Sequence, residues 1–197
     1  MQKIMPQSSK VESLLRSKLN EVGLGKCSPS SFEINVASVL IKHNLDFDFN
    51  QKLVCDTTAM IPNLFATNMP LNFKFQQDIA LANVPMPHET IFRPDFIIKD
   101  LEVNKKSLVL EPHGKQFFDD KRIRKYKSFM DNFGSDYYFV IITDMTIGAL
   151  NRKLMKCGLK INDICSEVIY SKKNGALQNL EKRLIKFERQ KTQQVIQ

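Results

Sequence analysis

The sequence has no long hydrophobic run and no leader-like N-terminal segment. No apolar stretch approaches the roughly 20 residues that a helix needs to cross a bilayer. The N-terminal segment MQKIMPQSSK also lacks the apolar region of a secretory signal. We therefore expect an intracellular protein in the cytoplasm (the host cytoplasm if the chain is viral), with no membrane partner.

Cysteine and histidine are also scarce. The four cysteines (Cys27, Cys55, Cys157 and Cys165) are scattered and form no C-x-x-C pair, so reduced thiols are favoured over a zinc site or a disulfide framework. Three histidines are too few and too dispersed for a histidine-based metal centre. With 197 residues, 43% of them hydrophobic and 25% charged, the composition is that of one soluble globular domain with a substantial core.

An apolar hairpin is predicted in the segment RPDFIIKDLEVNKKSLVLEPHGK. The runs Phe96–Ile98 and Leu108–Leu110 indicate two short buried strands, and the polar stretch Lys99–Ser107 between them indicates the turn. Antiparallel pairing of the two runs, residue by residue, places Asp95 opposite Glu111 at the open end, with their Cβ atoms about 5 Å apart. The segment therefore predicts two neighbouring carboxylates.

Two close carboxylates repel each other and tend to take up a proton, and a bound divalent cation removes that cost. Hard oxygen ligands are what Mg²⁺ prefers. The alternative is that both groups are solvated turn residues, as most charged side chains are. His113, Gly114 and Lys115 follow directly, and so dense a polar cluster after an apolar run is expensive to bury unless its groups are paired or bind a metal. We therefore expect a metal site for phosphate chemistry.

These motifs resemble the PD-(D/E)xK nuclease superfamily, whose core has an acidic helix, a Pro-Asp strand, a Glu-x-Lys strand and a following helix. Here Pro94-Asp95 matches the first strand motif, and Glu111-Pro112-His113 occupies the second, with His113 where lysine is usual. Gly114 directly follows the strand motif, and in this the sequence is similar to very-short-patch-repair-like endonucleases. Holliday-junction resolvases and viral nucleases have the same superfamily core. The resemblance covers about residues 28–143.

The resemblance implies an α/β fold with a restriction-endonuclease-like core, a central mixed β-sheet flanked by helices. It implies a single nuclease-like domain over 1–197, with the core at about 28–143, an insertion at 56–92 and a basic C-terminal helix at 171–197. The implied activity is that of a metal-dependent endonuclease using Mg²⁺ or Mn²⁺ on nucleic acid, expected to be DNA, with a homodimer to cut both strands. The alternative is a catalytically inactive DNA-binding or interaction subunit of a recombination or transposition complex.

The resemblance also assigns roles to individual residues. Asp95, Glu111 and the Pro112 carbonyl would bind the metal. His113 would accept a proton from water or stabilise negative charge, and Lys115 is the other candidate for the place of the usual lysine. Glu33 occupies the position of a further catalytic carboxylate, although Ser30-x-x-Glu33 also has the pattern of a helix capping box.

Two basic tracts indicate a polyanionic partner. Residues 115–127 carry six Lys/Arg against two acidic residues, and residues 171–197 carry seven against two, within a net charge of +8. A solvated helix face explains either tract alone, but a basic tract beside a carboxylate pair favours nucleic acid. The residues expected to contact its backbone are Gln116, Lys121, Arg122 and Lys125.

The hydrophobic pattern gives the remaining elements. Helices are expected over about 9–22, 31–44, 120–133, 143–156 and 177–187, and strands over 45–49, 136–143 and 166–171. Asp119 or Asp120 would cap the helix over 120–133, and Thr143 or Asp144 the one that follows. Segment 56–92 is expected to be irregular, with a hairpin around LNFKF and DIALAN. The inward-facing residues expected in the helix over 120–133 are Ile123, Tyr126, Met130 and Phe133.

Overall fold

The computed structural model describes residues 7–56, 89–171 and 177–194. The chain divides into two compact units, one formed by residues up to 52 together with those from 93 onward, and the other by residues 53–92. The predicted hairpin around LNFKF and DIALAN lies outside the described residues. No helix among the described ranges is long and apolar enough to span a bilayer.

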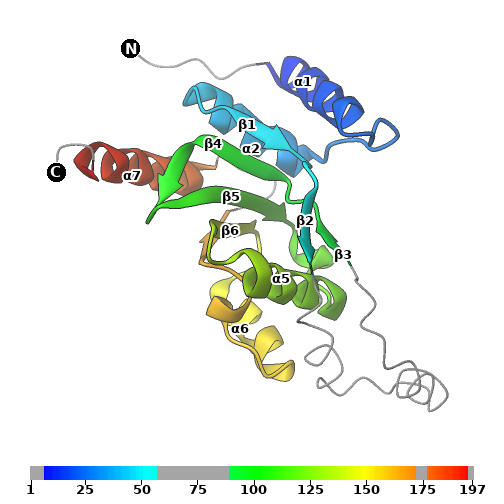
Figure 1. Ribbon diagram of the computed structural model, residues 1–197, viewed down its shortest axis with the longest axis vertical. Coiled ribbons are helices and arrows are strands. Elements are labelled where there is room, and N and C mark those ends of the chain that lie inside the picture. Colours follow the sequence, from blue (N-terminus) through cyan, green and yellow to red (C-terminus); the bar gives the residue numbers. More distant parts are fainter. Residues whose placement is uncertain (1–6, 57–88, 172–176, 195–197) are drawn as a thin grey trace. The chain divides into compact units, whose positions relative to one another are not determined.

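The first unit contains a five-stranded sheet with helices on both sides (Figure 1). Its elements are α1 (Ser8–Glu21), α2 (Ser31–Lys42), β1 (Phe47–Phe49), β4 (Phe96–Val103), β5 (Lys106–His113), the short 3-10 helix η1 (Lys115–Phe117), α5 (Asp120–Phe133), β6 (Tyr137–Thr143), α6 (Ile147–Lys156), the short 3-10 helix η2 (Ile161–Asp163), β7 (Glu167–Tyr170) and α7 (Gln178–Gln194).

The second unit holds β2 (Leu53–Asp56) and β3 (Glu89–Phe92), which pair antiparallel. The sequence pattern did not indicate these strands, because each is only four residues long and alternation over so few positions is a weak signal. The expectation of an irregular segment over 56–92 with a hairpin around LNFKF and DIALAN is therefore wrong at the described ends, where Asp56 and Glu89–Phe92 lie in strands.

The sheet is mixed, with strand order β1-β4-β5-β6-β7. β4 runs antiparallel to both β1 and β5, whereas β5, β6 and β7 are parallel to one another. Parallel neighbours need a crossover connection, and α5 and α6 supply the two crossovers. The predicted α/β class with a mixed sheet flanked by helices is confirmed.

The β4–β5 hairpin has the predicted register. Phe96 pairs with Leu110, and Ile98 with Leu108. The predicted turn over 99–107 is wrong, because β4 and β5 continue to a tight turn at Asn104 and Lys105, both with positive φ (54° and 63°). Such left-handed pairs are the usual two-residue hairpin connection. The register shifts between residues 98 and 102, which accommodates the polar residues of this stretch.

The two faces of the sheet pack differently. Leu108 and Leu110 point toward the core that α1, α2 and α7 cover. Side chains alternate along a strand, so Val109, Glu111 and His113 point to the opposite face. Aromatic side chains of α5 pack on that face, with the ring of Phe129 centred 4.5 Å from that of Phe139 on β6.

Helix α5 begins at the predicted cap, since the Asp119 Oδ1 accepts the Arg122 N–H at 2.7 Å. Its buried side chains are Ile123, Tyr126 and Phe129. Met130 and Phe133 are half-buried, and the ring of Phe133 packs on those of Phe129 and Tyr137, with centroids 5.3 and 6.2 Å apart. The inward row follows a three-residue spacing because Phe129, which the sequence analysis passed over, is the residue that packs on β6.

The predicted cap of α6 is also wrong. Thr146 caps this helix, and its Oγ1 accepts the Ala149 N–H at 3.4 Å. Thr143 is instead the last residue of β6, paired with His113. Asp144 accepts the Lys115 backbone N–H at 2.6 Å. Neither expected residue caps α6. Thr143 closes β6, and Asp144 binds the backbone at the start of η1.

The chain on either side of segment 53–92 is fixed to the first unit by hydrogen bonds. The Asn50 N–H donates to the Asp95 carbonyl at 3.0 Å, and Arg93 Nη1 donates to the Asn50 carbonyl at 3.2 Å. Asn50 has a φ of 55°, which turns the chain at this point. These bonds fix the backbone immediately before β4.

Candidate metal centre

Three potential ligands converge at one end of the β4–β5 hairpin. Asp95 precedes β4, whereas Glu111 and His113 lie two residues apart on β5 and share one face of the sheet. The Asp95 N–H donates to Glu111 Oε2 at 3.0 Å. Asp95, Glu111 and His113 each offer one ligand atom, and these three atoms lie within 4.8 Å of one another. The geometry is that of a site able to hold a metal ion.

Glu111 is held on several sides. It is 1% exposed, and its Oε1 accepts the Tyr126 hydroxyl at 3.2 Å and lies 3.9 Å from Arg122 Nη1. Burial raises the pKa of Glu111, although the charge of Lys125, the Asp95 N–H, Arg122 and the Tyr126 hydroxyl all act against that rise. These contacts orient the carboxylate and reduce its cost of ionisation.

Asp95 is half-buried beside this group. The pKa of its carboxyl lies well above the usual range, first because burial disfavours the charge, then because of the negative charges of Glu111 and Glu33. Lys125 and Arg122 oppose this rise but do not cancel it. The pair therefore tends to keep a proton unless a cation replaces it.

The imidazole of His113 packs against two aromatic rings that also contact each other. It meets the ring of Phe118 edge-on at 6.4 Å between centroids and that of Tyr126 at 6.1 Å. Burial, with the nearby charges of Arg122 and Lys125, lowers the pKa of His113 to about 4. At neutral pH the imidazole is therefore uncharged, which is the form that accepts a proton or binds a metal and not the form that stabilises an anion.

Tyr126 has a role that the sequence analysis missed. It was assigned to the core, and it is fully buried, in edge contact with Phe118 and Phe139. Its hydroxyl also donates to Glu111. The signal was present, because a buried tyrosine hydroxyl needs a polar partner and the candidate carboxylate Glu111 lay on the preceding strand.

Glu33 forms the capping box that was its structural alternative. Its carboxylate accepts the Ser30 N–H, and Ser30 Oγ accepts the Glu33 N–H at 3.2 Å. Within the described ranges, the cluster of close ligand atoms contains Asp95, Glu111 and His113 and does not extend to Glu33. The charge of Glu33 still reaches Asp95 and raises its pKa.

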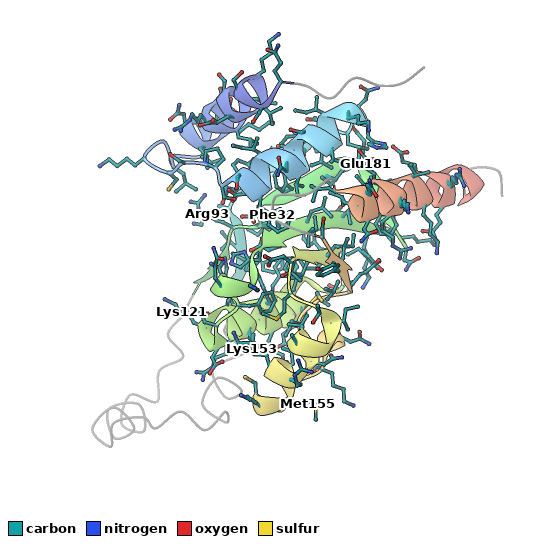
Figure 2. The ribbon with its side chains drawn as sticks, turned by 180° about the vertical axis from the view of Figure 1, so that it is seen from behind. Phe32, Arg93, Lys121, Lys153, Met155 and Glu181 are labelled. Atoms are coloured by element: carbon teal, nitrogen blue, oxygen red, sulfur yellow. The ribbon has the colours of Figure 1, made fainter. Side chains whose placement is uncertain are left out.

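The cations that act on both carboxyls come from α5. Arg122 and Lys125 lie one turn apart, and both lower the pKa of Asp95 and of Glu111. Lys115 and Gln116 lie in η1 with exposed side chains. Lys121 is exposed and projects outward from α5 (Figure 2). Two of the four predicted nucleic-acid contacts thus adjoin the carboxylates.

Pro112 is buried in β5 between the two ligand candidates and pairs with Ile142 of β6. Its carbonyl, a metal ligand in the resemblance, acts on the neighbouring imidazole and raises the pKa of His113 against the larger effect of burial. The proline has no N–H to donate to the sheet, and β5 ends one residue later.

Substituting Tyr126 by phenylalanine separates its two roles. The ring would keep its packing on Phe139, whereas Glu111 would lose the bond that orients it. We expect Tyr126→Phe to fold but to bind Mn²⁺ about tenfold more weakly, the usual effect of losing a partner of a metal ligand. Calorimetric titration with Mn²⁺ measures the affinity. Tyr137→Phe, a half-buried tyrosine on β6, is the control, and equal Mn²⁺ affinity in all three proteins would contradict the role of the hydroxyl.

Substituting Asp95 by asparagine should stabilise the metal-free protein. A carboxyl whose pKa is raised by folding stabilises the native state only while protonated, so stability falls as the pH rises through that pKa. Near neutral pH we expect Asp95→Asn to raise the free energy of unfolding by about 1 kcal/mol, or the Tm by about 2–4 °C. The difference should vanish in acid, where Asp95 is neutral in both states.

Thermal melts with and without Mn²⁺ measure this effect, because the ion should raise the Tm of the unsubstituted protein and leave that of Asp95→Asn unchanged. Glu102→Gln, which removes an exposed carboxylate of the same hairpin, serves as the control. A metal-free Asp95→Asn protein that melts below the unsubstituted protein near neutral pH would show that this carboxylate is not a source of strain.

Comparison of the chain with protein-family models, with curated proteins and with solved structures finds no match. The resemblance to a nuclease superfamily therefore rests on the sequence motifs alone.

Proposed function

We propose that this protein is a metal-dependent endonuclease that hydrolyses phosphodiester bonds in nucleic acid, with DNA as the expected substrate. The observation that carries the proposal is the convergence of Asp95, Glu111 and His113, with ligand atoms within 4.8 Å of one another. Support also comes from Arg122 and Lys125, which place positive charge beside the carboxylates. The Pro-Asp and Glu-x-His motifs add the resemblance to PD-(D/E)xK nucleases and their restriction-endonuclease-like core.

The residues present fit a divalent ion such as Mg²⁺ or Mn²⁺. Asp95 and Glu111 offer hard carboxylate oxygens. Burial raises the pKa of both, and the charge of Glu111 raises that of Asp95 further, so a bound cation would offset the cost of holding both groups ionised. When bound, such an ion polarises a phosphoryl oxygen and lowers the pKa of a water molecule.

The remaining chemistry belongs to the side chains around the pair. Arg122 and Lys125 would hold the phosphate oxygens and offset the charge that develops during attack. One ring nitrogen of His113 lies near the carboxylate oxygens, where a neutral imidazole would accept a proton from water or help to hold the ion. Tyr126 would keep Glu111 in place through the hydroxyl bond.

A second candidate is a nuclease-fold protein that binds nucleic acid without cutting it. The observation that favours it is the replacement of the usual lysine by His113, together with the exposed side chain of Lys115. Binding of DNA with no cleavage product under Mg²⁺ or Mn²⁺ selects this candidate over the endonuclease.

Removal of either carboxylate should abolish cleavage. We expect Asp95→Ala and Glu111→Ala to give no product above background from a panel of linear, nicked, branched and single-stranded DNA and RNA. Gel electrophoresis after incubation with and without Mg²⁺ or Mn²⁺ measures the cleavage of each strand. Glu102→Ala, on the same hairpin but exposed, should cleave at the unsubstituted rate. Undiminished cleavage by either site variant in the presence of metal would refute the proposal.

Removal of the α5 cations should weaken DNA binding. Measured in the Asp95→Asn background to prevent cleavage, Arg122→Ala and Lys125→Ala should each lower the affinity. Each should also reduce the slope of log affinity against log salt by about 1 for every phosphate that the variant no longer neutralises. Fluorescence anisotropy across a salt series gives both quantities. Lys156→Ala, an exposed lysine on α6, is the charge-matched control, and an unchanged slope in both α5 variants would show that these cations do not bind phosphate.

A further inference from the structure

The imidazole of His113 is placed and held like a metal ligand. His113 follows Glu111 by two residues on β5, so both side chains leave the same face of the sheet. The rings of Phe118 and Tyr126 contact each other, and both meet the imidazole edge-on. Tyr126 thus contacts both His113 and Glu111, through its ring and its hydroxyl respectively. One buried side chain of α5 fixes the directions of two neighbouring groups.

The spacing of the three groups also fits a common ion. Ligand atoms about 2.0–2.2 Å from a small divalent ion stand at most about 4.4 Å apart, when they lie on opposite sides of it. The three candidate atoms here lie within 4.8 Å of one another. This spacing is close to that limit, and an ion bound among the three atoms would offset the repulsion between the two carboxylates.

We propose that His113 is the third protein ligand of the metal, so that the site presents two carboxylate oxygens and one imidazole nitrogen. This inference rests on the metal site of the proposed function and names its ion class. Mg²⁺ takes oxygen ligands almost exclusively and gives up its waters reluctantly, whereas imidazole is a good ligand for first-row transition ions. The site therefore prefers Mn²⁺, or another ion of that row, to Mg²⁺.

The histidine also changes how charge is divided in the site. A lysine at position 113 would be a cation with three donors and no lone pair, so it would oppose the carboxylates without binding an ion. A neutral imidazole brings a lone pair and no charge. The positive charge that lysine would supply comes instead from Arg122 and Lys125, both of which act on Asp95 and Glu111. His113 can therefore take the role of a ligand.

Pulsed electron paramagnetic resonance of Mn²⁺ bound to the full-length protein tests the assignment. We expect the unsubstituted protein to show the modulation of a directly bound imidazole nitrogen, altered when the chain carries isotope-labelled histidine. In His113→Gln the modulation should disappear. His43→Gln is the matched control, because it removes a histidine at the far end of α2, and it should keep the signal.

Competition between Mn²⁺ and Mg²⁺, followed by the signal of unbound Mn²⁺, gives the second readout. We expect His113→Gln to lose about tenfold of the preference for Mn²⁺, in the range seen when a metal site loses one supporting group. If His113→Gln fails to fold, a signal that the labelled protein keeps in both His43→Gln and His88→Gln still assigns the bound nitrogen to His113, the remaining histidine of the three. An unchanged preference in a folded His113→Gln protein would overturn the inference.

The outcomes separate this inference from the proposed function. Suppose that Mn²⁺ binds to the unsubstituted protein, that Asp95→Asn abolishes this binding, and that no histidine nitrogen is detected. That result would overturn the role of His113 and leave the proposed metal-dependent endonuclease standing. Absence of any Mn²⁺ binding that depends on Asp95 would overturn both.

Discussion

The candidate site depends on the register of one antiparallel pair of strands. Phe96 pairs with Leu110, and this pairing is what brings the Asp95 N–H within 3.0 Å of the Glu111 carboxylate. A slip by one residue would turn every side chain of a strand to the other face of the sheet. The register is fixed because Leu108 and Leu110 must reach the core under α2 and α7. Apolar packing on one face thus sets the position of the charged groups on the other.

Ionisation of the two buried carboxylates lowers the stability of the native state. Burial and mutual repulsion raise the pKa of Asp95 and burial raises that of Glu111, so ionising the pair costs free energy in the native state. The surrounding groups limit that cost through the Tyr126 hydroxyl, the Arg122 guanidinium and the charge of Lys125. Strain of this kind, kept in place by a well-packed neighbourhood, is common where a protein binds an ion.

The sequence predicted the parts of this arrangement that follow from short-range pattern. Antiparallel pairing of the two apolar runs gave the hairpin register, and Asp119 was recognisable as a helix cap. The turn at Asn104 and Lys105 was missed because polar residues of β4 look like loop residues when the strand irregularity is unknown. The hydroxyl bond of Tyr126 could not be read from the helix alone, since it depends on how α5 packs against β5. The capping of α6 by Thr146 depended likewise on where β6 ends.

Hydrogen bonds just before β4 hold the backbone at Asp95 in place independently of segment 53–92. Asn50 binds the backbone carbonyl of Asp95, and Arg93 binds that of Asn50, so the two ends of segment 53–92 are anchored before the first carboxylate is reached. Insertions are best tolerated where their ends are already fixed to a stable body. A change in the length or sequence of that segment therefore leaves the geometry of Asp95 and Glu111 in place.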